Sequence, residues 1–364
     1  MESNPFIISG YLSPEYFCDR ETESARLTDA INNRRHITIF SPRRMGKSGL
    51  IKHVFHSLKK SKGISPVYID IMATSSIDEF AESFGKAIFS SLGKNENVLK
   101  KILKQLSSLR LKFSIDPLSG EPSISLDVSG RREAEQTLDA IFSYLSGQKE
   151  HFIVAIDEFQ QVTSYPDGLF EAVLRTHIQD INNVSMIFSG SSRHILTEIF
   201  SLPGRPLYNT TEIMELGMID QETYSRFISD RFRKGSKSIS VKALERIADI
   251  TGMHTFYVQY LCNRLYGSND NVDETTVNRM LLGIINENES VYGNYLRLLT
   301  PMQYRVLKAI ALNGGIENPT SKEFISSYNL GAASSVSQAV KSLSEKDFIF
   351  STQGRFNQIG RAHV

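Results

Sequence analysis

Cysteine, long apolar runs and net charge are all scarce in this chain of 364 residues. Its two cysteines, Cys18 and Cys262, are too few for a disulfide framework and lack metal-ligand spacing, which favours a reducing compartment. No apolar stretch approaches the ~20 residues that span a bilayer, and the N-terminus lacks the basic and apolar regions of a signal peptide. These absences predict a cytoplasmic protein that does not contact a membrane.

The net charge of +1 excludes a protein that binds nucleic acid through its overall charge. Any such role must depend on a local surface. The length predicts two or three domains.

Short apolar runs alternate with helical patterns over the first two thirds of the chain. This alternation predicts an α/β fold, in which a parallel sheet is flanked by crossover helices. The expected strands are residues 36–40, 66–71, 152–156, 184–189 and 212–216. After about residue 220 the strands stop and helical patterns follow.

The segment SPRRMGKSG follows the first expected strand and resembles a phosphate-binding loop, although Ser41 stands where glycine is usual. In such a loop, backbone N–H groups at a helix N-terminus bind phosphate, Lys47 reaches the β- and γ-phosphates, and Ser48 binds Mg²⁺. Gly46 lets the backbone approach closely. The alternative is a basic surface turn. The expected nucleotide-binding residues are Ser41, Pro42, Arg43, Arg44, Met45, Gly46, Lys47, Ser48 and Gly49.

A second acidic motif, FIVAIDEF, favours the nucleotide site over the basic turn. Asp157 ends an apolar strand, and a buried carboxylate there needs a cationic partner, such as a Mg²⁺ shared with Ser48. Glu158 is placed to orient or deprotonate a water that attacks the γ-phosphate. The alternative is an Asp-Glu pair that only caps a helix. Together the two motifs predict ATP and Mg²⁺ as cofactors.

The C-terminal part has the order helix, helix-turn-helix and hairpin, which is typical of a winged helix. Thr300 and Ser335 are expected to cap its first and third helices. From Arg297 onward it carries seven basic and four acidic residues, a net +3 that is modest for a DNA reader. Duplex DNA and a protein partner both stay open as ligands of this part.

Four motifs in this order resemble the archaeal-type ATPase family, one of the AAA+-related signal-transduction ATPases. They are FCDRETE, SPRRMGKS, AIDEFQQV and IFSGSSRHI. The resemblance implies a P-loop NTPase sheet, a helical lid and a C-terminal winged helix. It implies that Ser189 is the polar sensor of the γ-phosphate, that Phe17–Glu23 lies near the adenine, and that the TGMHTFYVQYL segment belongs to a lid over the base.

Three departures from the family pattern accompany the resemblance. Ser41 replaces the loop glycine, Thr255 stands where a lid proline is frequent, and Asn209 and Thr210 stand where Gly-Arg often follows Pro-Leu-Tyr. Arg205 could take over as the charge-stabilising arginine, with Arg193 and Arg175 as rivals.

The predicted protein has a P-loop ATPase domain (4–216), a helical lid (217–292) and a winged helix (293–358). The winged helix is expected to be truncated by a non-native tail, IGRAHV, at 359–364. The expected function is that of a Mg²⁺-dependent ATPase acting as a nucleotide-driven switch. Its catalytic residues would be Lys47, Glu158, Ser189 and Arg205, and its metal ligands Ser48 and Asp157. The alternative is an ATP-gated DNA-binding regulator with negligible turnover. A partner protein or a second copy of the chain could supply a further arginine.

Overall fold

The computed structural model describes residues 4–91 (except 60 and 62), 111–115, 122–126 and 130–358 (except 167, 269, 347 and 353). The predicted tail at 359–364 lies outside the described residues. The chain forms two compact units. One, here called the sheet unit, comprises residues 20–41 and 47–216, and the other, called the helical unit, comprises 1–19, 42–46 and 217–364. The three predicted domain boundaries stay a prediction.

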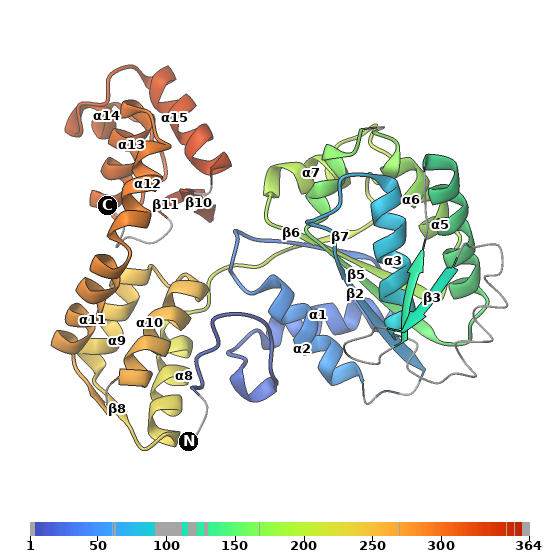
Figure 1. Cartoon of the computed structure of the whole chain (residues 1–364). Helices are drawn as coiled ribbons and strands as arrows, with labels where there is room; N and C mark the ends of the chain where they lie inside the picture. The colour runs from blue at the N-terminus through green and yellow to red at the C-terminus, as the bar shows by residue number, and fades with distance from the viewer. Residues whose placement is uncertain are drawn as a thin grey trace. The chain divides into compact units, whose positions relative to one another are not determined.

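A five-stranded parallel sheet forms the centre of the sheet unit, and its strands run in the order β2-β5-β6-β1-β7 (Figure 1). Each strand overlaps one of the five apolar runs, so the predicted α/β fold with a parallel sheet is confirmed. The strands are β1 (Ile37–Phe40), β2 (Ile64–Asp70), β5 (His151–Asp157), β6 (Val184–Gly190) and β7 (Glu212–Glu215). The residues of β1 and β6 are buried throughout because helices cover both faces.

Helices cover the sheet on both faces. Figure 1 shows α1 (Glu21–Asn32) and α2 (Lys47–Leu58) on one face. The opposite face carries α3 (Ile77–Ser91), α5 (Arg131–Ser146), α6 (Phe170–Gln179) and α7 (Arg193–Ser201), together with the short helix η2 (Phe159–Ser164). Phenylalanines dominate the core on this second face, where Phe159 and Phe188 lie 4.6 Å apart between ring centroids. Burial of such rings is the main stabilising contribution of this layer.

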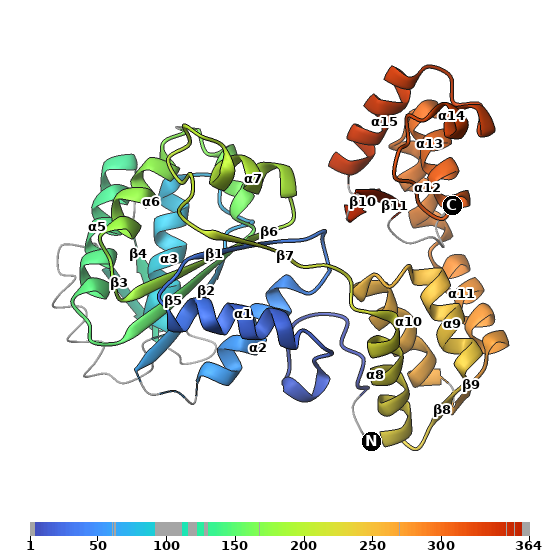
Figure 2. The same cartoon turned by 180° about the vertical axis from the view of Figure 1, so that it is seen from behind.

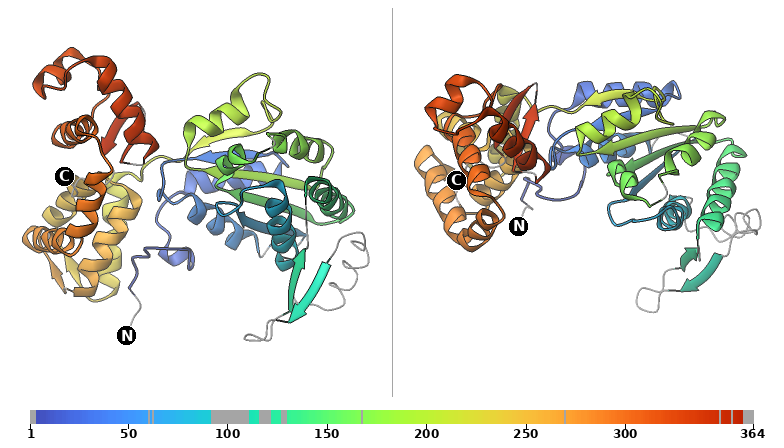
Figure 3. Two further views of the ribbon diagram at one scale, coloured as in Figure 1. Left: turned by 45° about the horizontal axis from the view of Figure 1, so that its top comes forward. Right: turned by 90° about the horizontal axis from the view of Figure 1, so that it is seen from above.

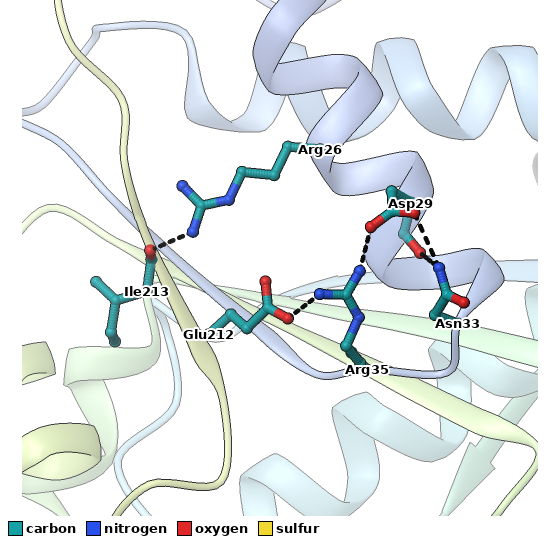
Figure 4. Close-up of polar contacts among 6 residues, drawn as sticks. All are labelled: Arg26, Asp29, Asn33, Arg35, Glu212 and Ile213. Atoms are coloured by element: carbon teal, nitrogen blue, oxygen red, sulfur yellow. Dashed lines mark hydrogen bonds and ion pairs between the residues drawn. The ribbon is translucent and has the colours of Figure 1, made fainter.

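The edge strand β7 is held to α1 by arginine side chains (Figure 4). Arg26 donates a hydrogen bond of 2.8 Å to the backbone carbonyl of Ile213. Arg35 bridges Asp29 of α1 and Glu212 of β7. Side-chain contacts to an edge strand occupy backbone groups and charges that would otherwise be available to another chain.

An antiparallel hairpin, β3 (Leu111–Ile115) and β4 (Pro122–Leu126), is inserted between α3 and α5 in the sequence. Figure 3 shows it beside α3, whose residues contact β4. The hairpin does not join the central sheet.

The helical unit contains a bundle of four helices, visible in Figure 2. They are α8 (Gln221–Lys234), α9 (Val241–Thr251), α10 (Thr255–Ser268) and α11 (Glu274–Glu287), and the two short strands β8 (Ser238–Ile239) and β9 (Asn271–Val272) pair between them. The N-terminal segment takes part in the same core through Phe6 and Cys18. The helical series predicted after residue 220 is confirmed.

The winged helix follows with the predicted order of elements. It contains α13 (Pro301–Leu312), α14 (Lys322–Ser327), α15 (Ala333–Glu345) and the antiparallel strands β10 (Ile349–Thr352) and β11 (Arg355–Gln358), and α12 (Glu289–Arg297) precedes it. Thr300 forms a capping box with Gln303, as expected of an N-cap. The cap predicted at Ser335 is wrong, because α15 begins two residues earlier and Ala332 occupies its N-cap.

No helix among the described residues is long and apolar enough to cross a membrane.

Candidate functional site

The predicted phosphate loop connects β1 to α2, which begins at Lys47. Gly46 has φ of +98°, and a Cβ added to it would meet no atom within 4 Å. Glycine is therefore required here for its backbone conformation and not for space. Arg44 also lies in the left-handed region, with φ of 61°. The loop ends at the N-terminus of α2, where unpaired N–H groups favour an anion.

Ser41 and Lys47 form the two ends of the loop and contact one another. The Lys47 ammonium donates to the Ser41 carbonyl at 2.8 Å and lies 3.4 Å from the Ser41 hydroxyl oxygen. Both residues are buried, with exposed fractions of 5% and 2%. The substitution of glycine by serine is therefore accommodated, and the Ser41 backbone orients the lysine.

Asp157 is the centre of the candidate site. Its carboxylate accepts hydrogen bonds from Ser48 at 2.5 Å, from Tyr68 at 2.5 Å, and from Ser189. These groups come from α2, β2 and β6, so four distant segments meet at the carboxyl end of β5. Of the predicted residues, Ser48, Asp157 and Ser189 are brought together directly.

Burial alone would raise the pKa of Asp157, which is 2% exposed. The hydrogen bonds from Ser189, Ser48 and Tyr68, in that order of effect, together with the charge of Lys47, outweigh burial and lower its pKa below the usual value. The carboxylate is thus held in its charged form.

Tyr68 is a functional residue that the sequence analysis missed. It lies on β2, the strand paired with β5, and its ring has the Lys52 ammonium 4.7 Å from the centroid. Burial, followed by the neighbouring Asp157, raises the pKa of Tyr68, so its hydroxyl stays a donor. The only signal in the sequence is a tyrosine near the carboxyl end of the neighbouring strand, which does not by itself indicate a role.

We expect Tyr68→Phe to weaken the orientation of Asp157. A hydrogen bond to a charged group contributes about 1.5–3 kcal/mol, so the Mg²⁺ concentration that gives half-maximal stabilisation by ATP should rise roughly tenfold. Thermal unfolding at fixed ATP with increasing Mg²⁺ measures this value. An unchanged Mg²⁺ midpoint would show that the hydroxyl plays no part, and Tyr208→Phe, at an exposed tyrosine outside the cluster, serves as the control.

Glu158 has φ of 58°, and its carboxylate accepts a hydrogen bond from Gln160 and lies 3.4 Å from the Ser191 hydroxyl. Gln160 in turn packs closely against Gly190 at the end of β6. A Cβ on Gly190 would fall 2.0 Å from the Gln160 side-chain oxygen and 3.1 Å from Leu196. Gln160 and Gly190 are further residues that the sequence motifs did not reveal.

Gly190→Ala should therefore displace Gln160 and release the Glu158 carboxylate. Overpacking of this kind costs about 1–3 kcal/mol, and we expect ATP hydrolysis to fall more than nucleotide binding. Chemical denaturation and phosphate release measure the two effects. The control is Gly283→Ala in α11, where the added methyl meets no atom within 4 Å; equal losses of activity in both variants would contradict the expectation.

The predicted arginines lie elsewhere in the sheet unit. Arg205 forms ion pairs with Glu171 and, at 3.2 Å, with Glu198. Arg175 donates to the Pro206 carbonyl, and Arg193 pairs with Glu215 at 3.2 Å. Burial raises the pKa of Glu171 even though Arg205 opposes the shift.

The donor set around Asp157 fits Mg²⁺. This ion prefers oxygen ligands and usually keeps water and phosphate oxygens alongside one or two protein groups. Ser48 and Asp157 provide two such oxygens in contact with each other. Among the described residues there is no group of three or more His, Cys, Asp or Glu side chains that could hold a metal on its own.

Residues 17–261 match the family described as "ATPase domain predominantly from Archaea". The chain belongs to this family. The family match confirms the predicted resemblance and identifies a nucleotide-binding ATPase domain. Residues 290–359 match a second family, described as "Probable winged helix domain", in agreement with the arrangement of α13, α14 and α15.

Solved structures of three archaeal proteins resemble this ATPase along nearly its whole length. The Walker-type ATPase PABY2304 of Pyrococcus abyssi is 18% identical, with 99% of this chain and 98% of that chain covered and a TM-score of 0.67. The Aeropyrum pernix ORC2 protein with ADPNP and ADP is 16% identical, with 99% and 94% covered and a TM-score of 0.58. The Aeropyrum pernix ORC1 protein with DNA is 14% identical, with 99% and 95% covered and a TM-score of 0.55. No curated protein matches the chain.

The lid segment of this archaeal-type ATPase departs from the family pattern at Thr255. Its hydroxyl lies 3.4 Å from the Met45 carbonyl of the phosphate loop, a hydrogen bond that proline could not make. Gly252 ends α9 in the left-handed conformation, with φ of 54°.

Proposed function

We propose that this ATPase binds ATP with Mg²⁺ and hydrolyses it slowly, as a nucleotide-driven switch. The observation that carries the proposal is the contact between Ser48 at the start of α2 and Asp157 at the end of β5. A serine and a carboxylate in this relation, directly after a lysine at a helix N-terminus, fit the phosphate and metal end of a nucleotide site.

Each residue of the cluster has a role in the proposal. Lys47 neutralises charge on the β- and γ-phosphates, and Ser48 and Asp157 hold Mg²⁺, which supplies further neutralisation of the phosphate oxygens. Glu158 orients the attacking water and accepts its proton. Ser189, which donates to the Asp157 carboxylate, responds to the state of the γ-phosphate.

A charge-stabilising arginine remains to be assigned. Arg205 would have to leave Glu171, which is 7% exposed, and a buried carboxylate without its partner is costly. The proposal therefore gives Arg205 a structural role in the resting protein and takes the arginine from a second copy of the chain or from a partner protein. Phosphoryl transfer gains strongly from such an arginine, so hydrolysis by the isolated chain should be slow.

Phosphate release under excess ATP tests the proposed turnover. The expected result is a steady release that continues beyond one phosphate per chain and stops when Mg²⁺ is chelated. Release that never exceeds one equivalent would overturn the enzymatic part and favour a protein that is set by ATP occupancy alone.

A second candidate function is ATP-gated DNA binding through the winged helix. Its third helix, α15, exposes short polar groups and a lysine that suit phosphate and base-edge contacts. These are Ser334, Ser335, Ser337, Gln338 and Lys341. The Aeropyrum pernix ORC1 protein, which has a similar fold, is described in complex with DNA.

Fluorescence anisotropy of a labelled duplex tests this second function. Binding that depends on ATP, weakens with salt and falls in Lys341→Ala would support it. Equal anisotropy with and without the protein, under all nucleotide conditions at low salt, would exclude duplex DNA.

A further inference from the structure

The helical unit contains a half-open cavity of about 480 Å³ that the proposed ATP chemistry does not use. Its lining includes none of Lys47, Ser48, Asp157 and the segment 17–23 that is expected near the adenine. Its volume lies in the range of small-molecule sites, about 300–1,000 Å³.

Aromatic rings line much of this cavity. Three come from α10, two from α12 and one from the segment before β10: Phe256, Tyr257, Tyr260, Tyr292, Tyr295 and Phe348. On the α10 side, Phe256 and Tyr260 are nearly coplanar at 11°, with centroids 5.9 Å apart. On the other side, Tyr295 and Phe348 meet edge to face at 6.1 Å. A planar group between these rings would have aromatic partners from both sides.

The cavity uses the face of α10 that points away from the N-terminal segment. Val258 and Cys262, one turn apart, pack in the core that contains Cys18, whereas Phe256 and Tyr260 line the cavity. This separation distinguishes the cavity from the base site implied by the family resemblance.

Positive charges line the same cavity. Arg43 and Arg44 of the phosphate loop and Lys346 after α15 all contribute, and no carboxylate is among the described residues that line it. The Arg44 guanidinium lies 4.4 Å from the centroid of the Phe256 ring, and no ion pair to a carboxylate joins Arg44 among the described residues. An arginine that stacks on an aromatic ring and keeps its N–H groups available is well suited to an anion.

We propose that this cavity is a second ligand site, which takes a planar aromatic molecule carrying one anionic group. The ring system would stack between Phe256 and Tyr295, and the anion would meet Arg44 and Lys346. A nucleoside monophosphate and an aromatic carboxylic acid share this chemistry. The site goes beyond the proposed ATPase function and does not depend on it.

Fluorescence titration of the full chain with 8-anilinonaphthalene-1-sulfonate tests the proposal, because this probe is aromatic, anionic and bright when bound. Its uncharged analogue, N-phenyl-1-naphthylamine, shows whether the anion contributes. The expected result is one probe per chain, bound at least tenfold more tightly than the analogue. Equal affinity for both compounds would overturn the charge assignment and with it the proposal.

Variants locate the probe in the cavity. Arg44→Asn, which tolerates the left-handed backbone, and Tyr295→Ala, at a ring that is 47% exposed, should each weaken the probe about tenfold without unfolding the chain. The controls Lys322→Ala and Tyr208→Ala should leave it unchanged. Unchanged binding in both cavity variants, with circular dichroism showing folded protein, would contradict the proposal.

Competition then distinguishes the two sources of the ligand. Guanosine monophosphate and indole-3-acetate are each added to the bound probe, in wild type and in Lys47→Ala. Displacement by either compound in both proteins supports the site and names its ligand class, and displacement by neither overturns it. Displacement of the probe by guanosine monophosphate in wild type alone would place the compound at the phosphate loop and contradict the second site, and this outcome is separable from a failure of ATP binding.

Discussion

Lys47→Ala should abolish the stabilisation of the protein by Mg²⁺–ATP. In the wild type, ATP at a hundred times its dissociation constant adds about 2.7 kcal/mol to the free energy of unfolding, which corresponds to a rise in melting temperature of roughly 5–10 °C. The Lys47 ammonium is buried beside Ser41 and is the one cation of the cluster that can meet the β- and γ-phosphates among the described residues that contact Ser41, Ser48 or Asp157. Its loss removes the main counter-charge, so the rise should disappear.

Thermal unfolding with and without ATP measures this loss. The matched control is Lys86→Ala on α3, where the ammonium forms an exposed ion pair with Glu82, and its ATP-dependent shift should equal that of the wild type. An unchanged shift in Lys47→Ala would mean that ATP binds somewhere other than the phosphate loop.

Glu158→Gln should separate ATP binding from ATP hydrolysis. General-base catalysis contributes about 10²–10⁴-fold, and the amide keeps the size of the side chain while it loses the ability to accept a proton at neutral pH. We expect phosphate release to fall by that factor, whereas the shift in melting temperature with ATP stays the same. Hydrogen bonding from Gln160 holds the carboxylate in place in the resting protein.

Single-turnover hydrolysis of labelled ATP gives the rate of the chemical step directly. Glu289→Gln, an exposed glutamate at the start of α12, controls for the change of charge. A rate within a factor of two of the wild type would remove Glu158 from the catalytic role and leave it as the residue that caps η2 in a left-handed conformation.

The strands and the winged helix were predictable from the sequence because their signals are local. Apolar runs bounded by turn residues located all five sheet strands, and Thr300-Pro301 marked the start of α13 through a cap and the residue after it. Local signals also misled at Ser335, because α15 begins before it without any side-chain cap.

The candidate site was predictable only where a motif states the chemistry. Ser48 and Asp157 were paired by the known logic of a phosphate loop and a strand-end carboxylate, and their contact follows. Tyr68, Gln160 and Gly190 act through tertiary contacts between segments 30 to 90 residues apart, which no pattern within one segment encodes. The partners Glu171 and Glu198 of Arg205 were missed for the same reason.

Isothermal titration with ATP, in Mg²⁺ and in its absence, tests most directly whether Ser48 and Asp157 form the metal end of an ATP site. The account predicts one ATP per wild-type chain, bound at least tenfold more tightly with Mg²⁺, and binding by Asp157→Asn that no longer responds to Mg²⁺. No binding by the wild type, or the same response to Mg²⁺ in Asp157→Asn, would contradict it.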